Sequence, residues 1–176
     1  MPDDIRTHAK SLLKQYKKRS EATKIIDSAR ILAQLALQNK GLYPAHRRAM
    51  LNCAVWYCTE ADGKWKTRYK SKKVWDLAKD EPESLVLINH EHVFTIKNLV
   101  DEMLRNDEKL LDELPELYRL LDTAVGCIVT ECEHRKLTDG HGWHRYAEKV
   151  VVYDTAVVPP EIVELHLAQV LCTIDK

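Results

Sequence analysis

The sequence predicts an α+β fold that is mainly helical, with an N-terminal helical bundle joined to a small β-containing region. Glycine and proline are rare, at 5 and 6 of 176 residues, which favours helices over a loop-rich β architecture. Apolar residues recur at helical spacing in the first half, whereas the second half contains short apolar runs typical of buried strands. The length fits a single domain, residues 1–176, whose core needs no disulfide or structural metal.

Three helices are expected at the start of the chain. The first covers the strongly basic residues 5–18. The second runs from about residue 20 to Gly41, because glycine is common just after a helix, and its apolar stripe comprises Ile25, Ile26, Ala29, Leu32, Ala33 and Ala36. Pro44 suits the first turn of the third helix, which ends before the turn signal Asp62-Gly63.

Strands and helices alternate in the rest of the chain. A short helix is expected from about Ser71 to Lys79, before the polar link at 80–83. The later elements are strands at 84–88, 124–129 and 150–153, and helices from Thr95 or Lys97 to Leu104, over 110–121, and from Pro160 onward.

Several classes of protein are disfavoured by composition. No apolar run approaches the roughly 20 residues that a membrane-spanning helix needs, and the first ten residues are polar and charged. We therefore expect a cytoplasmic protein that does not associate with membranes. The five cysteines lack CxxC spacing, which indicates reduced thiols and not a disulfide framework.

The net charge of zero conceals a division along the chain. Residues 1–78 hold 17 Lys and Arg against 7 Asp and Glu, and residues 79–176 hold 10 against 20. Such asymmetry is typical of a basic surface for an anionic partner, of an acidic surface for a basic partner, or of two halves that attract each other within the fold.

The stretch INHEHVF at 88–94 places two histidines around a carboxylate at the end of an apolar run. In a strand, side chains alternate, so His90 and His92 face one way while Asn89 and Glu91 face the other. The two histidines then have the geometry to chelate one metal ion. Alternatively, an irregular strand end places Glu91 on the ion and leaves His92 to deprotonate a water molecule.

A second box follows the next predicted strand. Thr130 stands three residues before Glu133, which is the pattern of a capping box, so a helix is expected to begin there. His134 then lies in its first turn. A zinc site in which Cys127, Cys132 and His134 join His90 or His92 is another use of the same residues.

This layout of two strands and a helix with a histidine in its first turn resembles the ββα-metal core of HNH-type nucleases. The resemblance, over residues 84–146, implies that Glu91 and His134 bind a divalent metal ion (Mg, Mn or Zn) and that His92 is the general base of phosphodiester hydrolysis. The chain departs from the family where Phe94-Thr95-Ile96-Lys97 replaces its proline and glycines. The segments GCIVTECEHRKL and GWHRY also resemble small bacterial and phage proteins that pair the same two boxes.

The other informative stretch is KWKTRYKSKKVW at 64–75. In an extended conformation, basic residues at every second position would form one face for a phosphate backbone, and the aromatic residues between them could stack on bases. The candidate nucleic-acid-binding residues are Lys64, Lys66, Arg68, Lys70, Lys72, Lys73, Trp65 and Tyr69. The alternative is that Trp65 and Tyr69 pack inward while the lysines only face water.

Taken together, these patterns lead us to expect a nucleic-acid-associated protein with an HNH-like core, and specifically a metal-dependent endonuclease. The alternative is a phage or mobile-element protein without catalytic activity that binds a host protein through its charged halves. The sequence alone leaves open whether the protein is an enzyme.

Overall fold

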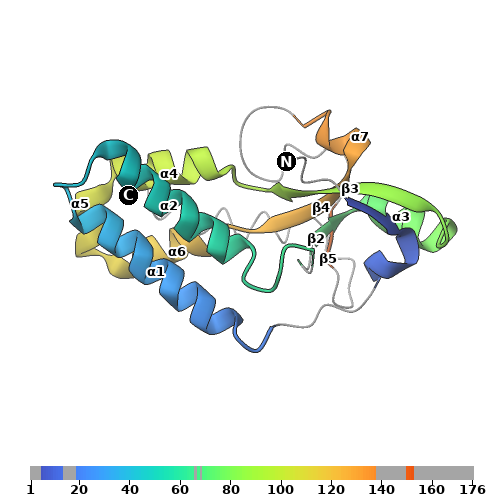
Figure 1. Ribbon diagram of the computed structural model, residues 1–176, viewed down its shortest axis with the longest axis horizontal. Coiled ribbons are helices and arrows are strands. Elements are labelled where there is room, and N and C mark those ends of the chain that lie inside the picture. Colours follow the sequence, from blue (N-terminus) through green and yellow to red (C-terminus); the bar gives the residue numbers. More distant parts are fainter. Residues whose placement is uncertain (1–4, 14–18, 66, 68, 138–149, 153–176) are drawn as a thin grey trace.

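The computed structural model describes residues 5–13, 19–65, 67, 69–137 and 150–152, and it has the mainly helical α+β fold that the sequence predicts. Five helices gather at one end of the molecule, and the strands lie at the other end with the two remaining α-helices of the described residues (Figure 1). Within the described residues, no helix is long and apolar enough to cross a membrane.

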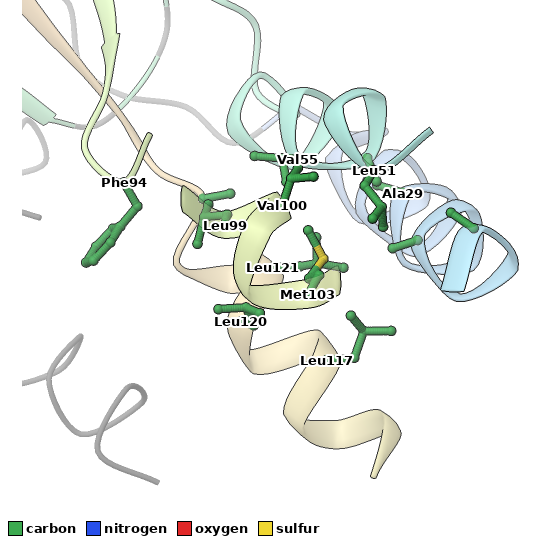
Figure 2. Packing of buried hydrophobic residues seen from close by; sticks show 14 of the residues in the cluster. Ala29, Leu51, Val55, Phe94, Leu99, Val100, Met103, Leu117, Leu120 and Leu121 are labelled. Atoms are coloured by element: carbon green, nitrogen blue, oxygen red, sulfur yellow. The ribbon is translucent and has the colours of Figure 1, made fainter. Parts of the chain in front are cut away.

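The helical end is built on a hairpin of α1 (Ala22–Gln38) and α2 (Pro44–Thr59), with Pro44 in the first turn of α2. Small buried residues of α1, among them Ala29 and Ala33, let the two helices approach closely at Leu51 and Val55 of α2 (Figure 2). The hairpin packs on α4 (Ile96–Arg105), α5 (Asp107–Asp112) and α6 (Leu114–Asp122). Each leucine buried in this core contributes about 2 kcal/mol to folding.

The other end is a five-stranded mixed sheet in the order β1-β3-β4-β2-β5. Its strands are β1 (Ile5–His8), β2 (Tyr69–Ser71), β3 (Leu85–His92), β4 (Gly126–Thr130) and β5 (Val150–Val152). All neighbouring pairs are antiparallel except β2 and β4, which are parallel. A second, smaller core lies between the sheet, the 3-10 helix η1 (Ala9–Leu13) and α3 (Lys72–Asp80).

Most predicted elements are confirmed, including three helix starts that depend on a capping side chain. Ser71, Thr95 and Thr130 each accept a backbone N–H three residues ahead, at the beginnings of α3, α4 and α7 (Glu131–His134). The acidic segment at 110–121 is two helices, α5 and α6, which are separated at Glu113. The expected terminal helix from Pro160, and the segment at 140–146, lie outside the described residues.

The prediction of a helix over residues 5–18 is wrong for its described part. Residues 5–8 form β1, which pairs with Leu85–Ile88 of β3, and η1 follows. This pairing joins segments that are far apart in the chain, and it outweighs the local preference of a short basic segment for helix.

The basic and acidic halves of the chain are joined by ion pairs. Basic residues before position 79 contact acidic residues after it in the pairs Lys10–Glu83, Arg30–Asp122, Lys40–Asp107, Lys40–Glu108, Arg47–Asp107 and Arg48–Asp101. Part of the charge division is therefore used inside the fold, as one of the three interpretations of the sequence expects.

Candidate functional site

The candidate site is assembled by the antiparallel pair β3 and β4 together with α7, which begins directly after β4. Thr130 and Glu133 form the predicted capping box. The Thr130 hydroxyl accepts the Glu133 N–H at 3.2 Å, and the Glu133 carboxylate accepts the Thr130 N–H at 2.8 Å. Because these bonds fix the first turn of α7 to the end of β4, they also fix the direction in which His134 leaves the sheet.

Two side chains of β3 hold α7 against the strand. Nδ1 of His134 and Oε2 of Glu91 lie 2.7 Å apart, and Asn89 donates a hydrogen bond to Glu131. Asn89 and Glu91 are two residues apart, so they project from the same face of the strand, as the alternation in the sequence predicts. The Glu91 side chain is only 14% exposed, whereas that of His134 is 46% exposed. The pair thus has a half-buried carboxylate and an imidazole that solvent can reach.

Glu131 adds a carboxylate to this edge of the site. The hydrogen bond from Arg135, and after it the bond from Asn89, hold the pKa of Glu131 below its usual value. Its negative charge is therefore retained at neutral pH next to the Glu91–His134 pair.

His92 is not brought to the pair that Glu91 and His134 form. Its ring lies 5.4 Å from that of His90 and 4.8 Å from that of Trp56, between ring centroids. The ring of His90 in turn contacts Trp65. His90 and His92 therefore share one face of β3, and Glu91 and His134 meet on the other.

The contacting pair has the right donor types for a divalent ion. A carboxylate oxygen and an imidazole nitrogen suit manganese and zinc, and two ligands at about 2.1 Å from one ion lie about 3 Å apart when they are adjacent. The observed 2.7 Å is the length of a direct hydrogen bond between the two side chains, so an ion that takes both as ligands has to replace this bond. Among the described residues, no three His, Cys, Asp or Glu are grouped so that they could hold an ion, so the fit is that of two protein ligands with the other positions open.

The alternative zinc site with cysteines is not seen among the described residues. Cys127, Cys132, His134 and either histidine of β3 all lie in the described part of the chain, where no such group forms. Cys127 is also fully buried, and burial raises the pKa of its thiol well above the usual value, which disfavours the thiolate that zinc requires.

The predicted basic strip does not form one continuous extended face. The strand extends only from Tyr69 to Ser71, and the helix α3 begins at Lys72. Lys70 is 3% exposed, and its ammonium donates to the carbonyl of Thr67 at 3.2 Å. Burial lowers the pKa of Lys70 to about 8. The prediction that Lys70 contacts a phosphate backbone is therefore wrong.

The other residues of that strip have different environments. Lys72 is exposed and forms an ion pair with Asp76, and Lys73 is half-buried. Trp65 and Tyr69 are also half-buried and pack against the smaller and the larger core, respectively, and the ammonium of Lys64 lies 5.4 Å from the Trp65 ring centroid. Lys66 and Arg68 lie outside the described residues.

Sequence reasoning missed two residues that surround these histidines. The hydroxyl of Ser71 donates to Glu133 at 2.8 Å and so links the start of α3 to α7. Trp56 contacts His92 from α2, and its place on the helix at four-residue intervals from Arg48 and Asn52 is the signal that could have indicated it.

Comparison of the chain with protein-family models, with curated proteins and with solved structures finds no match.

Proposed function

We propose that this is a nucleic-acid-associated protein whose β3–β4–α7 unit binds a divalent metal ion through Glu91 and His134. The observation that supports the proposal is the 2.7 Å contact between these two side chains, from a strand and from the first turn of a helix. The antiparallel pair β3 and β4, followed directly by α7, is the arrangement on which the proposed resemblance to a ββα-metal core depends. With only two protein ligands, such an ion would take its remaining ligands from water and a phosphate oxygen.

In this proposal the activity is phosphodiester hydrolysis. A bound divalent ion stabilises the charge that develops on the phosphate oxygens. Glu91 and His134 would hold that ion, while Asn89 and Arg135 hold the Glu131 carboxylate at the start of α7. The exposed side chains of Arg135 and Lys136 are near enough in sequence to His134 to attract the phosphate backbone. His92 stays a candidate base only if a water molecule or a movement of the strand connects it to the other face.

Metal binding is the direct test. We expect Mn²⁺ titration, followed by electron paramagnetic resonance, to detect one site in the wild-type protein, and Glu91→Gln or His134→Ala to weaken it at least tenfold. His46→Ala and Glu113→Gln are matched controls, because both residues are exposed and lie on α2 and between α5 and α6. Equal Mn²⁺ affinity in all five proteins would overturn the metal site.

Nucleolytic activity is tested separately. Plasmid DNA and single-stranded RNA are incubated with Mg²⁺, Mn²⁺ or Zn²⁺ and each protein. We expect cleavage that His134→Ala abolishes, whereas His92→Ala decides whether the imidazole on the other face takes part. Metal binding without cleavage by the wild type would reject the endonuclease and leave a metal-binding protein.

A second candidate function is supported by exposed apolar side chains on the outer face of the helical end. Ile31 and Leu35 lie one turn apart on α1, and Leu42 and Tyr43 follow in the turn to α2. Surface patches of this kind are typical of protein interfaces, so an interaction protein that binds a host factor is the alternative. Its test is the double variant Ile31→Glu with Leu35→Glu, which should abolish binding to the host factor without loss of thermal stability; Lys24→Glu on the same helix is the control.

A further inference from the structure

A pocket lies between α2 and the first turn of α4, and neither Glu91 nor His134 lines it. The residues Arg48, Asn52 and Trp56 line it from α2 at intervals of four, together with Cys53, and Ile96 and Lys97 line it from α4. Its volume of about 650 Å³ lies within the range of small-molecule sites. Arg48, Asn52 and Trp56 line the pocket together because residues four apart lie on the same face of a helix.

The floor of the pocket is aromatic and held in place. The Trp56 ring contacts the His92 ring at 4.8 Å between centroids, and the ammonium of Lys64 lies 5.6 Å from the Trp56 ring centroid. Ile96 supplies the apolar wall on the α4 side. A flat apolar group therefore finds a preorganised surface there, which lowers the entropic cost of binding.

The rim of the pocket is basic. Lys97 is exposed, and within the described residues no ion pair involves it. The Arg48 side chain is 44% exposed and forms an ion pair with Asp101 at 2.7 Å. Among the described residues, Arg48 and Lys97 line the pocket, Lys64 lies beside the Trp56 ring, and Asp101 pairs with Arg48. This charge favours an anionic ligand.

We propose that the pocket binds one nucleotide of a single-stranded nucleic acid, with its base against Trp56 and Ile96 and its phosphate at Lys97 and Arg48. Aromatic stacking combined with cations along the backbone is the general chemistry by which proteins hold single strands. A paired base offers no open face to stack on, so duplex is the weaker ligand. The amide of Asn52 both donates and accepts hydrogen bonds at the edge of the base.

The inference rests on the proposed association with nucleic acid, and it names where a strand binds. It is tested by fluorescence anisotropy with labelled single-stranded DNA and RNA of 12 nucleotides, with the same sequence in duplex form as competitor. We expect Trp56→Leu to weaken binding about tenfold and Trp56→Phe to retain most of it, because stacking on one base contributes a factor of this size. Lys97→Glu should lower the salt dependence of binding by about one unit of slope.

Two exposed-residue variants and one control separate an effect on the pocket from an effect on the fold. Because Trp56 packs on His92, Trp56→Leu could also disturb the fold, but Lys97 and Asn52 are exposed, so Lys97→Glu and Asn52→Ala test the pocket without that effect. Lys24→Glu, an equal change of charge on the outer face of α1, is the matched control.

The outcomes separate this inference from the proposed function. Tight binding of the oligonucleotide that none of the pocket variants weakens, or that Lys24→Glu weakens as much as Lys97→Glu, overturns the pocket and leaves the nucleic-acid association standing. If neither the single-stranded DNA nor the single-stranded RNA binds at low salt, both the pocket and the nucleic-acid association are overturned. Stronger binding of duplex than of single strand also rejects the inference, because the stacking surface would then have no role.

Discussion

The imidazole of His90 lies directly over the Cα atom of Gly126, across the pair of strands β3 and β4. A Cβ atom at Gly126 would stand 2.6 Å from Cε1 of His90 and closer still to Nε2. Only glycine leaves room for the ring at this position, and the ring of His90 is in turn in contact with the rings of His92 and Trp65.

Gly126→Ala should therefore destabilise the protein by about 2 kcal/mol, because the added methyl group must displace a buried ring. Urea unfolding followed by circular dichroism measures this change. Gly41→Ala is the control, since a Cβ atom there meets nothing within 4 Å, and it should leave the free energy of unfolding within about 0.5 kcal/mol. Equal effects of the two substitutions would contradict the close approach of His90.

Ser71 contacts the starts of two helices, α3 and α7, so its substitution should affect both. Its hydroxyl accepts the Val74 N–H at 3.2 Å and donates to Glu133 at 2.8 Å, and the residue is buried. Ser71→Ala should lower the free energy of unfolding by about 1–2 kcal/mol, as for other helix caps. It should also shift the NMR signals of the His134 ring, because Glu133 helps to fix α7.

The exposed Ser28 on α1 provides the comparison for this cap. Ser28→Ala should be neutral or slightly stabilising, because alanine has the higher helix propensity. A Ser71→Ala protein with unchanged stability and unchanged His134 signals would show that the two helix starts are independent.

Arg47 joins the basic half to the acidic half more firmly than its neighbours do. Its guanidinium donates to the carbonyls of Ala36 and Leu37 at the end of α1, and to Asp107 at 3.1 Å, with both charged side chains under 20% exposed. Arg47→Met should cost about 2–3 kcal/mol, whereas Lys40→Met, at an exposed pair, should cost clearly less. Chemical denaturation of both variants checks this order.

The same pair predicts a dependence on pH. Burial tends to raise the pKa of Asp107, but the bonds from Arg47 and Lys40 outweigh it and hold this pKa below the usual 3.8. The stabilisation is therefore complete above about pH 4 and is lost as the pH falls through the lower value of the folded state. Arg47→Met should lose less stability than the wild type over that acidic range; a parallel loss in both proteins would contradict the assignment.

Local signals account for the elements that the sequence predicts well. The capping box at Thr130 was recognisable in the sequence, and Ser71 and Thr95 were expected as helix starts, because capping needs only a side chain and a backbone N–H three residues away. The strand β1 could not be predicted in this way, because Ile5–His8 becomes a strand through pairing with residues about eighty positions later. The burial of Lys70 has the same origin, since β2 lies between β4 and β5.

The candidate site was predictable where it follows from strand geometry. Alternation along β3 correctly separated Glu91 from His90 and His92, and the capping box correctly placed His134 in a first helical turn. The alternative in which Glu91 binds the ion and His92 deprotonates a water molecule requires an irregular strand end. In the structure β3 remains regular through His92, which pairs with Gly126, so the alternation persists to its end.

Lys70 carries the last prediction, because its ammonium is buried in the sheet and donates a hydrogen bond to the carbonyl of Thr67. Burial lowers its pKa from 10.5 to about 8, so the folded state binds this proton less tightly than the unfolded chain does. Below pH 8 both states are protonated and the folded state bears the full penalty. Between about pH 8 and 10.5 the unfolded chain alone retains the proton, so this residue makes stability rise with pH.

Lys70→Met removes the charge and keeps most of the volume. The lowered pKa of Lys70 corresponds to a destabilisation of the folded state by about 3 kcal/mol at pH 7. The variant also loses the hydrogen bond to Thr67, which costs about 1 kcal/mol, so Lys70→Met should be about 2 kcal/mol more stable than the wild type. Urea unfolding at pH 7, 8.5 and 10 should show this advantage shrinking as the pH rises. The exposed Lys72 supplies the control, because Lys72→Met should change stability by less than about 0.5 kcal/mol. If Lys70→Met is not more stable than the wild type at pH 7, or if its advantage grows toward pH 10, the ammonium of Lys70 reaches solvent. Lys70 would then again be a candidate for contact with a phosphate backbone.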